Sequence, residues 1–262
     1  MFRWGNPSVL GWVRRAQRGK MCVETDRATY GGVARHTILL CLLTIIAAVA
    51  VEAILWLAIL RPEASFGDVQ YWIYGLIGMG VVGIVWVVMH IVILIAPKTA
   101  RLLGPICCLL QGLFLGVTAF TFDLFVPGIS FAALLGTGIV FLFVLFLYKG
   151  MGVRVKSNFW RVALIFLASY LVAQLAMAIV CLLMNSWAMF WIGAVTSLIC
   201  IAMACFTIIW DIQNIDMLVE AGVDKSYEWC VSYALTTSLV YLYMNILQLL
   251  FRFFALFSRS KK

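Results

Sequence analysis

Seven long apolar segments take up most of this chain, and they constrain its fold more than any other feature. A helix needs about 20 residues to cross the ~30 Å hydrocarbon core of a bilayer. Strands of a membrane barrel would instead alternate in polarity over about ten residues. The segments therefore predict an all-α polytopic membrane protein with a bundle of seven transmembrane helices. Their predicted bounds are Thr37–Leu60, Tyr71–Ala96, Leu102–Phe122, Ile129–Tyr148, Trp160–Met184, Trp187–Trp210 and Cys230–Phe257.

The charged residues indicate how the bundle is oriented in the membrane. They make up only 11% of the 262 residues, and most of the 19 Lys and Arg residues fall before the first segment or in alternate loops. Under the positive-inside rule, this distribution predicts a cytoplasmic amino terminus. We expect a basic cytoplasmic tail at 1–36, a membrane domain at 37–257 and a short basic tail at 258–262, in the inner membrane of a bacterium.

The last apolar segment carries polar side chains at helical spacing. They are Ser238, Tyr241, Asn245, Gln248 and Arg252. At 3.6 residues per turn these positions form one stripe along the helix. Lipid cannot satisfy such groups, so the stripe must face protein or a wet cavity. We therefore expect the last helix to be central and its stripe to line an ion or proton path. Asn245→Leu should then disturb the protein more than a change outside the stripe, such as Thr236→Leu.

Three acidic residues lie at the end of the sixth segment and just beyond it. Asp211 ends the apolar run, and Asp216 and Glu220 follow in what we expect to be a cytoplasmic loop. Burial against the last helix and the like charges of the two neighbours would both favour the protonated form of Asp211. Asp211 is therefore a candidate pH switch and a candidate Ca²⁺ ligand. A solvated acidic loop flanking a helix end would produce the same pattern.

Three polar residues of the first and third segments need separate interpretations. Glu52 lies well inside an apolar run, and the sequence favours neither a functional role nor a protonated or water-reaching residue. Gln111 is expected to bond to a neighbouring helix. Asp123, just before Pro127-Gly128, is expected to be an exposed loop residue. The spacing Gly112-x-x-x-Gly116 indicates close helix packing.

The sequence also argues against several functional classes. It contains no nucleotide-binding loop, nucleophile elbow or zinc-protease motif, so we do not expect an enzyme. Its eight cysteines lack the spacing of a metal site. The net charge of +8 is not accompanied by a nucleic-acid-binding motif. We expect the lipid bilayer as its main partner, no nucleic acid, and no cofactor other than a transported Ca²⁺. The sequence does not indicate an oligomeric state.

The order of several short motifs resembles the Bax-inhibitor family. The run Trp-Asp-Ile-Gln-Asn-Ile-Asp at 210–216 resembles the end of that family's sixth helix. The run Leu-Val-Tyr-Leu-Tyr-Met-Asn-Ile-Leu-Gln-Leu-Leu at 239–250 resembles its last helix. Residues 109–116 and 127–129 resemble its third and fourth helices. The resemblance covers residues 30–255, and more narrowly it is to the bacterial branch related to YccA.

This resemblance implies a seven-helix bundle with a central last helix and a pH-sensitive calcium leak. In that family, two acidic residues on the sixth and seventh helices form a latch. Asp211 matches the first, whereas Asn245 is aligned with the second, so the latch lacks one carboxylate. The amide Gln111 replaces an acidic residue usual in the third helix. His90 is the nearest candidate for a basic partner expected on the second helix.

Two functions of different classes follow from these observations. The first is a passive cation leak, with Asp211 at its cytoplasmic mouth and the polar stripe along its route. The second is a non-conducting membrane regulator, because the YccA resemblance implies binding to a membrane-anchored AAA+ protease. The basic amino-terminal tail would then bind the partner.

Overall fold

The computed structural model describes residues 27–59, 69–155 and 188–259, in which every regular element is helical. Six of these helices are long and apolar enough to cross a membrane, so the protein is a helical integral membrane protein. They are α2 (Tyr30–Ile59), α3 (Val69–Ile95), α4 (Ala100–Phe125), α5 (Ile129–Gly150), α7 (Ala188–Glu220) and α8 (Glu228–Arg259). The predicted segment Trp160–Met184 lies outside the described residues, so the count of seven helices stays a prediction.

Helix α7 is longer than the sequence pattern predicted. The apolar run ends at Trp210, yet the helix continues through Asp211 and Asp216 to Glu220. The prediction of a loop directly after Trp210 was therefore wrong. Hydropathy falls where charged residues begin, but no glycine or proline interrupts residues 211–220. Extending an existing helix costs little compared with starting one, so the helix propagates past the apolar run.

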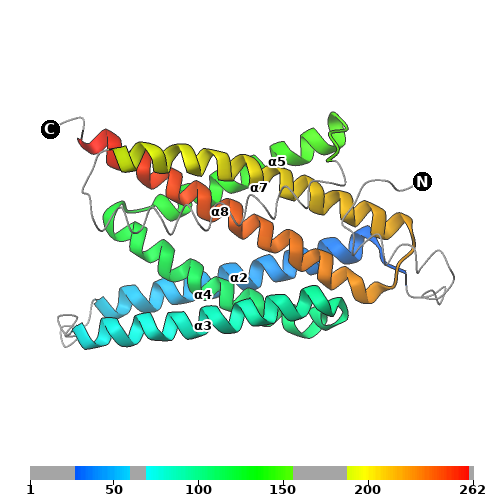
Figure 1. Ribbon diagram of the computed structural model, residues 1–262, viewed down its shortest axis with the longest axis horizontal. Coiled ribbons are helices and arrows are strands. Elements are labelled where there is room, and N and C mark those ends of the chain that lie inside the picture. Colours follow the sequence, from blue (N-terminus) through cyan, green and yellow to red (C-terminus); the bar gives the residue numbers. More distant parts are fainter. Residues whose placement is uncertain (1–26, 60–68, 156–187, 260–262) are drawn as a thin grey trace.

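Gly222 ends α7 and reverses the chain. Its φ of 62° lies in the left-handed region, which glycine adopts without steric cost. The Gly222 N–H donates to the Val219 carbonyl at 3.0 Å, and the Val223 N–H donates to the Leu218 carbonyl at 3.2 Å. This pair of bonds is a Schellman motif. A short 3₁₀ helix, η2 (Lys225–Tyr227), then leads into α8, which runs antiparallel to α7 (Figure 1).

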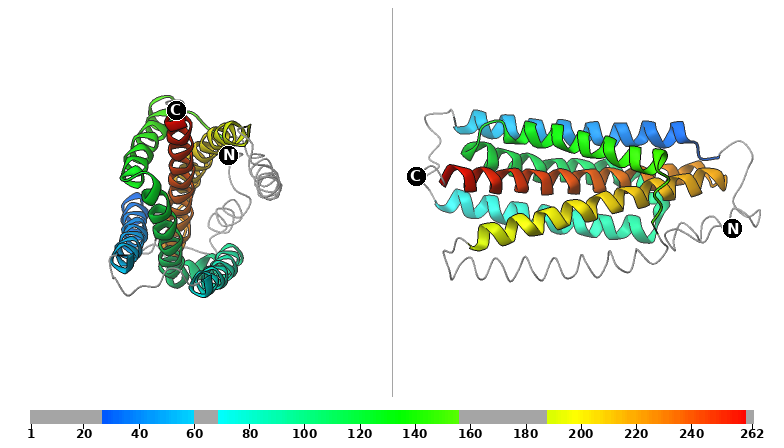
Figure 2. Two further views of the ribbon diagram at one scale, coloured as in Figure 1. Left: turned by 90° about the vertical axis from the view of Figure 1, so that its left-hand side faces the viewer. Right: turned by 90° about the horizontal axis from the view of Figure 1, so that it is seen from above.

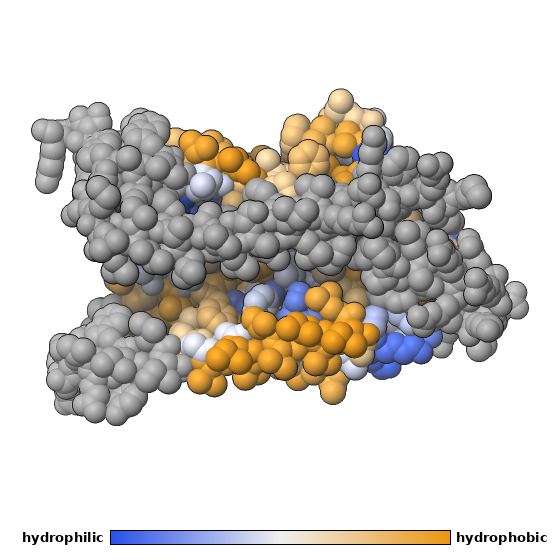
Figure 3. All heavy atoms as spheres, viewed as in Figure 1, coloured by the Kyte–Doolittle hydropathy of each residue, from blue (hydrophilic) through white to orange (hydrophobic). Residues whose placement is uncertain are grey.

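Helix α8 lies in the middle of the described helices (Figures 1 and 2). It contacts α2, α4, α5 and α7, and none of residues 227–253 is exposed. This is the position that its polar stripe requires. Helix α3, in contrast, packs against α4 at the edge of the bundle. The outer surface of its residues Gly78–Ile95 is apolar (Figure 3), as expected for a helix that faces lipid.

Helices α2 and α4 approach each other closely at two glycines of α4. A Cβ atom at Gly112 would lie 2.5 Å from the Ala47 Cβ and 2.6 Å from the Thr44 carbonyl oxygen. A Cβ atom at Gly116 would overlap the Ala48 carbonyl oxygen. The packing role predicted for this glycine pair is therefore confirmed.

One end of the bundle gathers four chain segments that are distant in sequence. They are the start of α2, the α3–α4 turn, the end of α5 and the α7–α8 turn (Figure 1). The Ala28 N–H donates to the Val223 carbonyl at 2.8 Å, and Lys98 Nζ lies 4.0 Å from Asp224 Oδ2. We call this the basic end. Its basic residues include Arg27, Arg35, Lys98, Arg101, Lys149, Arg154 and Lys225. These segments therefore share one side of the membrane, as the charge pattern predicted.

Candidate functional site

The polar stripe of α8 follows the neighbouring helix α7. Towards the basic end, the Ser238 hydroxyl donates to Asp211 Oδ2 of α7 at 2.6 Å. Towards the opposite end, the Arg252 guanidinium donates to the Ser197 hydroxyl at 2.6 Å and to the Gly193 carbonyl, both on α7. Because both ends of the stripe bond to the same helix, the stripe lies along the α7–α8 interface. Asp211 is partly buried in this interface.

The residue opposite Asp211 is Ser238 and not Asn245. Asn245 lies two turns further along α8, about 10 Å along the helix axis at 1.5 Å per residue. Its side chain is only 3% exposed, and its amide donates to the Tyr241 carbonyl of its own helix at 2.8 Å. The resemblance had aligned Asn245 with the second latch residue, but the structure does not place Asn245 beside Asp211. Gln248 is half-buried on the same stripe.

Asp216 and Glu220 lie on a different face of α7 from Asp211. Asp216 Oδ2 accepts a hydrogen bond from the Tyr148 hydroxyl at 2.5 Å and lies 3.3 Å from Arg154 Nη1. The guanidinium carbon of Arg154 is 4.4 Å from the centroid of the Tyr148 ring. These contacts join the end of α5 to α7, whereas Glu220 is exposed. The structure therefore does not bring the three predicted carboxylates together.

Thr236 is more enclosed than the sequence indicated. It was predicted to lie outside the polar stripe and to tolerate an apolar substitution better than Asn245. Instead it is fully buried, with its hydroxyl donating to the Ser232 carbonyl at 2.9 Å and accepting from the Cys41 thiol at 3.7 Å. The side of α8 away from its polar stripe packs against α2 at this position, so Thr236 is enclosed as well.

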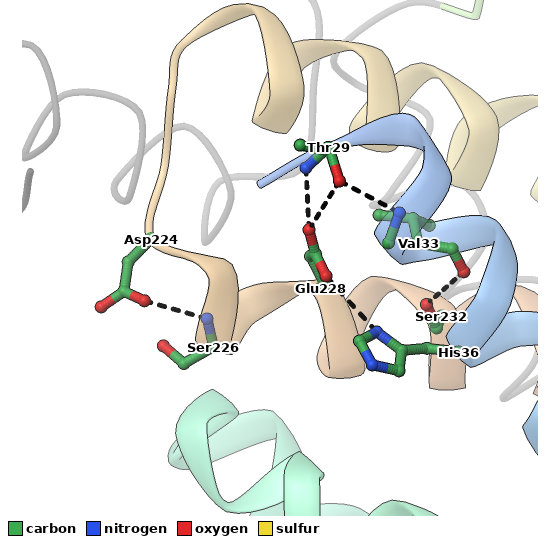
Figure 4. Close-up of polar contacts among 8 residues, drawn as sticks. Thr29, Val33, His36, Asp224, Ser226, Glu228 and Ser232 are labelled. Carbon is green, nitrogen blue, oxygen red and sulfur yellow. Dashed lines mark hydrogen bonds and ion pairs between the residues drawn. The ribbon is translucent and has the colours of Figure 1, made fainter. Parts of the chain in front are cut away.

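Glu228 is a buried carboxylate that the sequence did not single out. Its side chain has no exposed area, and Oε1 accepts from the Thr29 N–H at 2.8 Å and the Thr29 hydroxyl at 3.4 Å (Figure 4). His36 Nδ1 lies 3.4 Å from Oε2. Gly32 leaves room for this contact, because a Cβ atom at that position would overlap the Glu228 carboxylate. Glu228 therefore joins the start of α2 to the start of α8.

Two features of the sequence point to the Glu228 contact in retrospect. Glu228 is the first residue of α8, where a negative charge is favoured by the helix dipole. His36 and Trp229 are aromatic residues near the ends of two apolar segments, and their rings pack with centroids 4.0 Å apart. The sequence alone could not show that these two ends meet.

The remaining polar residues of the first and third predicted segments have partners inside the bundle. Asp123 is buried, accepts from the Ser130 N–H at 3.1 Å and hydrogen-bonds to Glu52, so its prediction as an exposed loop residue was wrong. Gln111 Nε2 donates to the Thr237 hydroxyl of α8 at 3.2 Å, which is the interhelical bond predicted for it.

His90 does not lie beside the Asp211 carboxylate. Its Nδ1 is 2.9 Å from the hydroxyl oxygen of Tyr233 on α8. The ring also packs against Trp86 of its own helix, with centroids 5.6 Å apart. His90 therefore links α3 to α8 and does not supply the basic partner that the resemblance led us to look for.

The oxygen atoms that the structure places at Asp211 are too few for a tight Ca²⁺ site. Within residues 27–59, 69–155 and 188–259, no three His, Cys, Asp or Glu side chains are grouped closely enough to hold a metal ion. Asp211 offers one carboxylate, and Ser238 offers one hydroxyl. A tight Ca²⁺ site takes six to eight oxygen ligands, so this pair can hold a cation only weakly.

The fold and this interface define a polytopic helical membrane protein with a buried polar seam between two helices. A family model described as Bax inhibitor 1 like matches residues 11–255, so the chain belongs to the Bax-inhibitor-1-like family. Searches of curated proteins and of solved structures gave no match.

Proposed function

We propose that this protein is a pH-sensitive cation leak that carries Ca²⁺ and is closed by the Ser238–Asp211 hydrogen bond. The observation that carries the proposal is this bond, because it joins α7 to α8 at one end of an enclosed polar stripe. Tyr241, Asn245 and Gln248 then line the route towards Arg252. Hydroxyl and amide oxygens can coordinate a passing cation weakly enough to release it.

The direction of the pH response follows from the chemistry of this bond. A hydroxyl that donates to an ionised carboxylate makes a charge-assisted bond, roughly twice as strong as a neutral one. Ionised Asp211 therefore holds α7 against α8. Protonation removes the charge and weakens the bond, so the two helices separate more readily. We expect the leak to increase as the pH falls.

The proposal also covers the finer features of membrane placement. It includes a seventh transmembrane helix, a cytoplasmic amino terminus, the inner membrane of a bacterium and membership of the YccA-like branch. The basic end faces the cytoplasm in this arrangement, in line with the positive-inside rule. Asp211 then lies near the cytoplasmic mouth and Arg252 near the outer mouth.

Flux measurements on purified protein in liposomes test the proposal. Ca²⁺, Mg²⁺ and K⁺ are supplied in turn, and we expect a flux that exceeds that of empty liposomes and increases at acidic pH. Asn245→Leu removes a polar group from the stripe and should reduce the flux. The matched control is Thr121→Leu, since Thr121 is exposed on α4 and its hydroxyl bonds to its own helix; this variant should conduct like the wild type.

Absence of flux for every cation and pH would leave the non-conducting regulator as the better function. That alternative is tested separately by removing the basic tail. The deletion should stop at residue 25, because Ala28 and Thr29 bond to the α7–α8 turn and to Glu228. If the deletion abolishes binding to a membrane-anchored AAA+ protease and leaves flux unchanged, the tail acts in regulation.

A further inference from the structure

A groove between α2 and α5 reaches the central helix from the lipid-facing surface. Its volume is about 250 Å³. Ile45 of α2 and Leu134 of α5 line it and are 37% and 42% exposed, so the groove opens outwards. Leu239 and Val240 of α8 also line it. The groove therefore gives access to a helix that is otherwise enclosed.

The lining of the groove has no polar group in need of a partner. The hydroxyls of Thr44, Thr137 and Thr236 each donate to a carbonyl of their own helix, at 2.8–2.9 Å. The Cys41 thiol donates to the Thr236 hydroxyl. The Tyr243 hydroxyl donates to the Ser130 carbonyl at 3.5 Å. The other lining side chains, which include Leu115 and Phe141, are apolar. An apolar occupant can fill such a groove without losing hydrogen bonds.

The groove lies at the depth of the hydrocarbon core. Thr44 is at the middle of α2, and Thr137 is near the middle of α5, so the lining is far from either membrane surface. At this depth the bilayer supplies acyl chains and no water. An empty groove would forfeit the dispersion contacts of its walls.

We propose that this groove binds an acyl chain of a membrane phospholipid, which contacts Leu239 and Val240 of α8. Val240, Tyr243 and Thr236 recur at helical spacing on the face of α8 opposite the polar stripe. The acyl chain and the stripe therefore flank α8 on opposite sides. The proposal concerns the groove alone and does not depend on ion conduction.

Photo-crosslinking of the full-length protein in vesicles tests this site. The vesicles contain phosphatidylcholine with a diazirine at the middle of one acyl chain, and adducts are mapped by mass spectrometry. We expect adducts on α8 within residues 236–243, in addition to those on exposed residues of α2 and α5. A wild-type map with adducts on the outer faces and none on α8 would overturn the proposal.

Gly138→Leu provides the matched loss-of-binding variant. Gly138 lines the groove, and a Cβ there meets no atom within 4 Å, so the leucine side chain can occupy the groove without a clash. Most α8 adducts should be lost, while adducts on exposed Ile139 persist. Gly78→Leu is the control, since a Cβ at Gly78 on α3 also meets open space and lies outside the groove. Unchanged α8 labelling in a folded Gly138→Leu protein would contradict the proposal, and the wild-type map decides the matter if this variant does not fold.

Discussion

At the scale of single residues, the proposed switch depends on the position that faces Asp211. A hydroxyl at Ser238 donates one hydrogen bond to the carboxylate at 2.6 Å, so the proposed switch has one titrating group at this contact. A pair of carboxylates would instead titrate as a coupled unit, with two protons released in two steps. In the proposed mechanism, Ser238 therefore stands where a two-carboxylate latch would have its second carboxyl group.

Ser238→Asp should give the flux a steeper pH dependence than the wild type has. The substitution places a second carboxyl group beside Asp211, and each group changes the protonation of the other. Asn245→Asp is the contrasting variant, because Asn245 bonds to its own helix two turns away and should leave the steepness unchanged. A Ser238→Asp profile that overlays the wild-type profile would show that Ser238 is not the facing position.

Glu228→Ala should lower the thermal stability of the protein in detergent. The change removes the acceptor of the Thr29 N–H from a part-buried contact, and a hydrogen bond of this kind contributes about 0.5–1.5 kcal/mol. Glu228→Gln keeps a carbonyl oxygen for Thr29 and should cost less. Exposed Glu220→Ala serves as the control and should melt with the wild type. Equal melting temperatures for all four proteins would mean that Glu228 does not hold α2 to α8.

At the scale of helices, hydropathy predicted where each described helix lies but not where each one ends. The apolar runs located α3, α4 and α5 to within a few residues. The pattern ended α7 too early, because an apolar window stops at Asp211 whereas a helix stops at a residue such as Gly222. The start of α2 at Tyr30 was missed for the same reason, since Arg35 and His36 lie in its first turns.

Gly112→Val should destabilise the packing of α2 on α4. The new side chain would meet Ala47 and the Thr44 carbonyl at distances far below van der Waals contact, and overpacking of this kind costs about 1–3 kcal/mol. Gly78→Val is the matched control, because open space surrounds that position on α3. Thermal unfolding in detergent measures both. A Gly112→Val protein as stable as the control would contradict close packing at this crossing.

At the scale of the whole molecule, the sequence predicted which end of each helix shares a side but not how neighbouring helices are rotated against each other. Alternating loops and the clustering of basic residues placed the α3–α4 and α7–α8 turns together, and Lys98 lies near Asp224. The Asp211–Ser238 pair could not be predicted, because it depends on the relative rotation and register of two helices. A polar stripe identifies the buried face of its own helix, but it does not show which residue of a neighbouring helix lies opposite.

Lys225→Cys and Pro127→Cys should react with membrane-impermeant thiol reagents from opposite sides. Both residues are exposed, and they lie in the α7–α8 and α4–α5 turns at opposite ends of the bundle. With a cytoplasmic basic end, Lys225→Cys is labelled only after the cells are opened, whereas Pro127→Cys is labelled in intact cells. The labelling of each variant is compared with that of the wild type, which reports the reaction of the native cysteines. The reverse pattern would invert the proposed orientation.

The pH profile of Ca²⁺ flux in Asp211→Asn tests the central claim most directly. The amide cannot ionise and cannot form the charge-assisted bond with Ser238, so it resembles the protonated carboxyl group at every pH. In liposomes we expect the variant to conduct at alkaline pH as the wild type does at acidic pH, with a flat profile. A variant whose flux falls with rising pH as steeply as the wild type would contradict Asp211 as the switch.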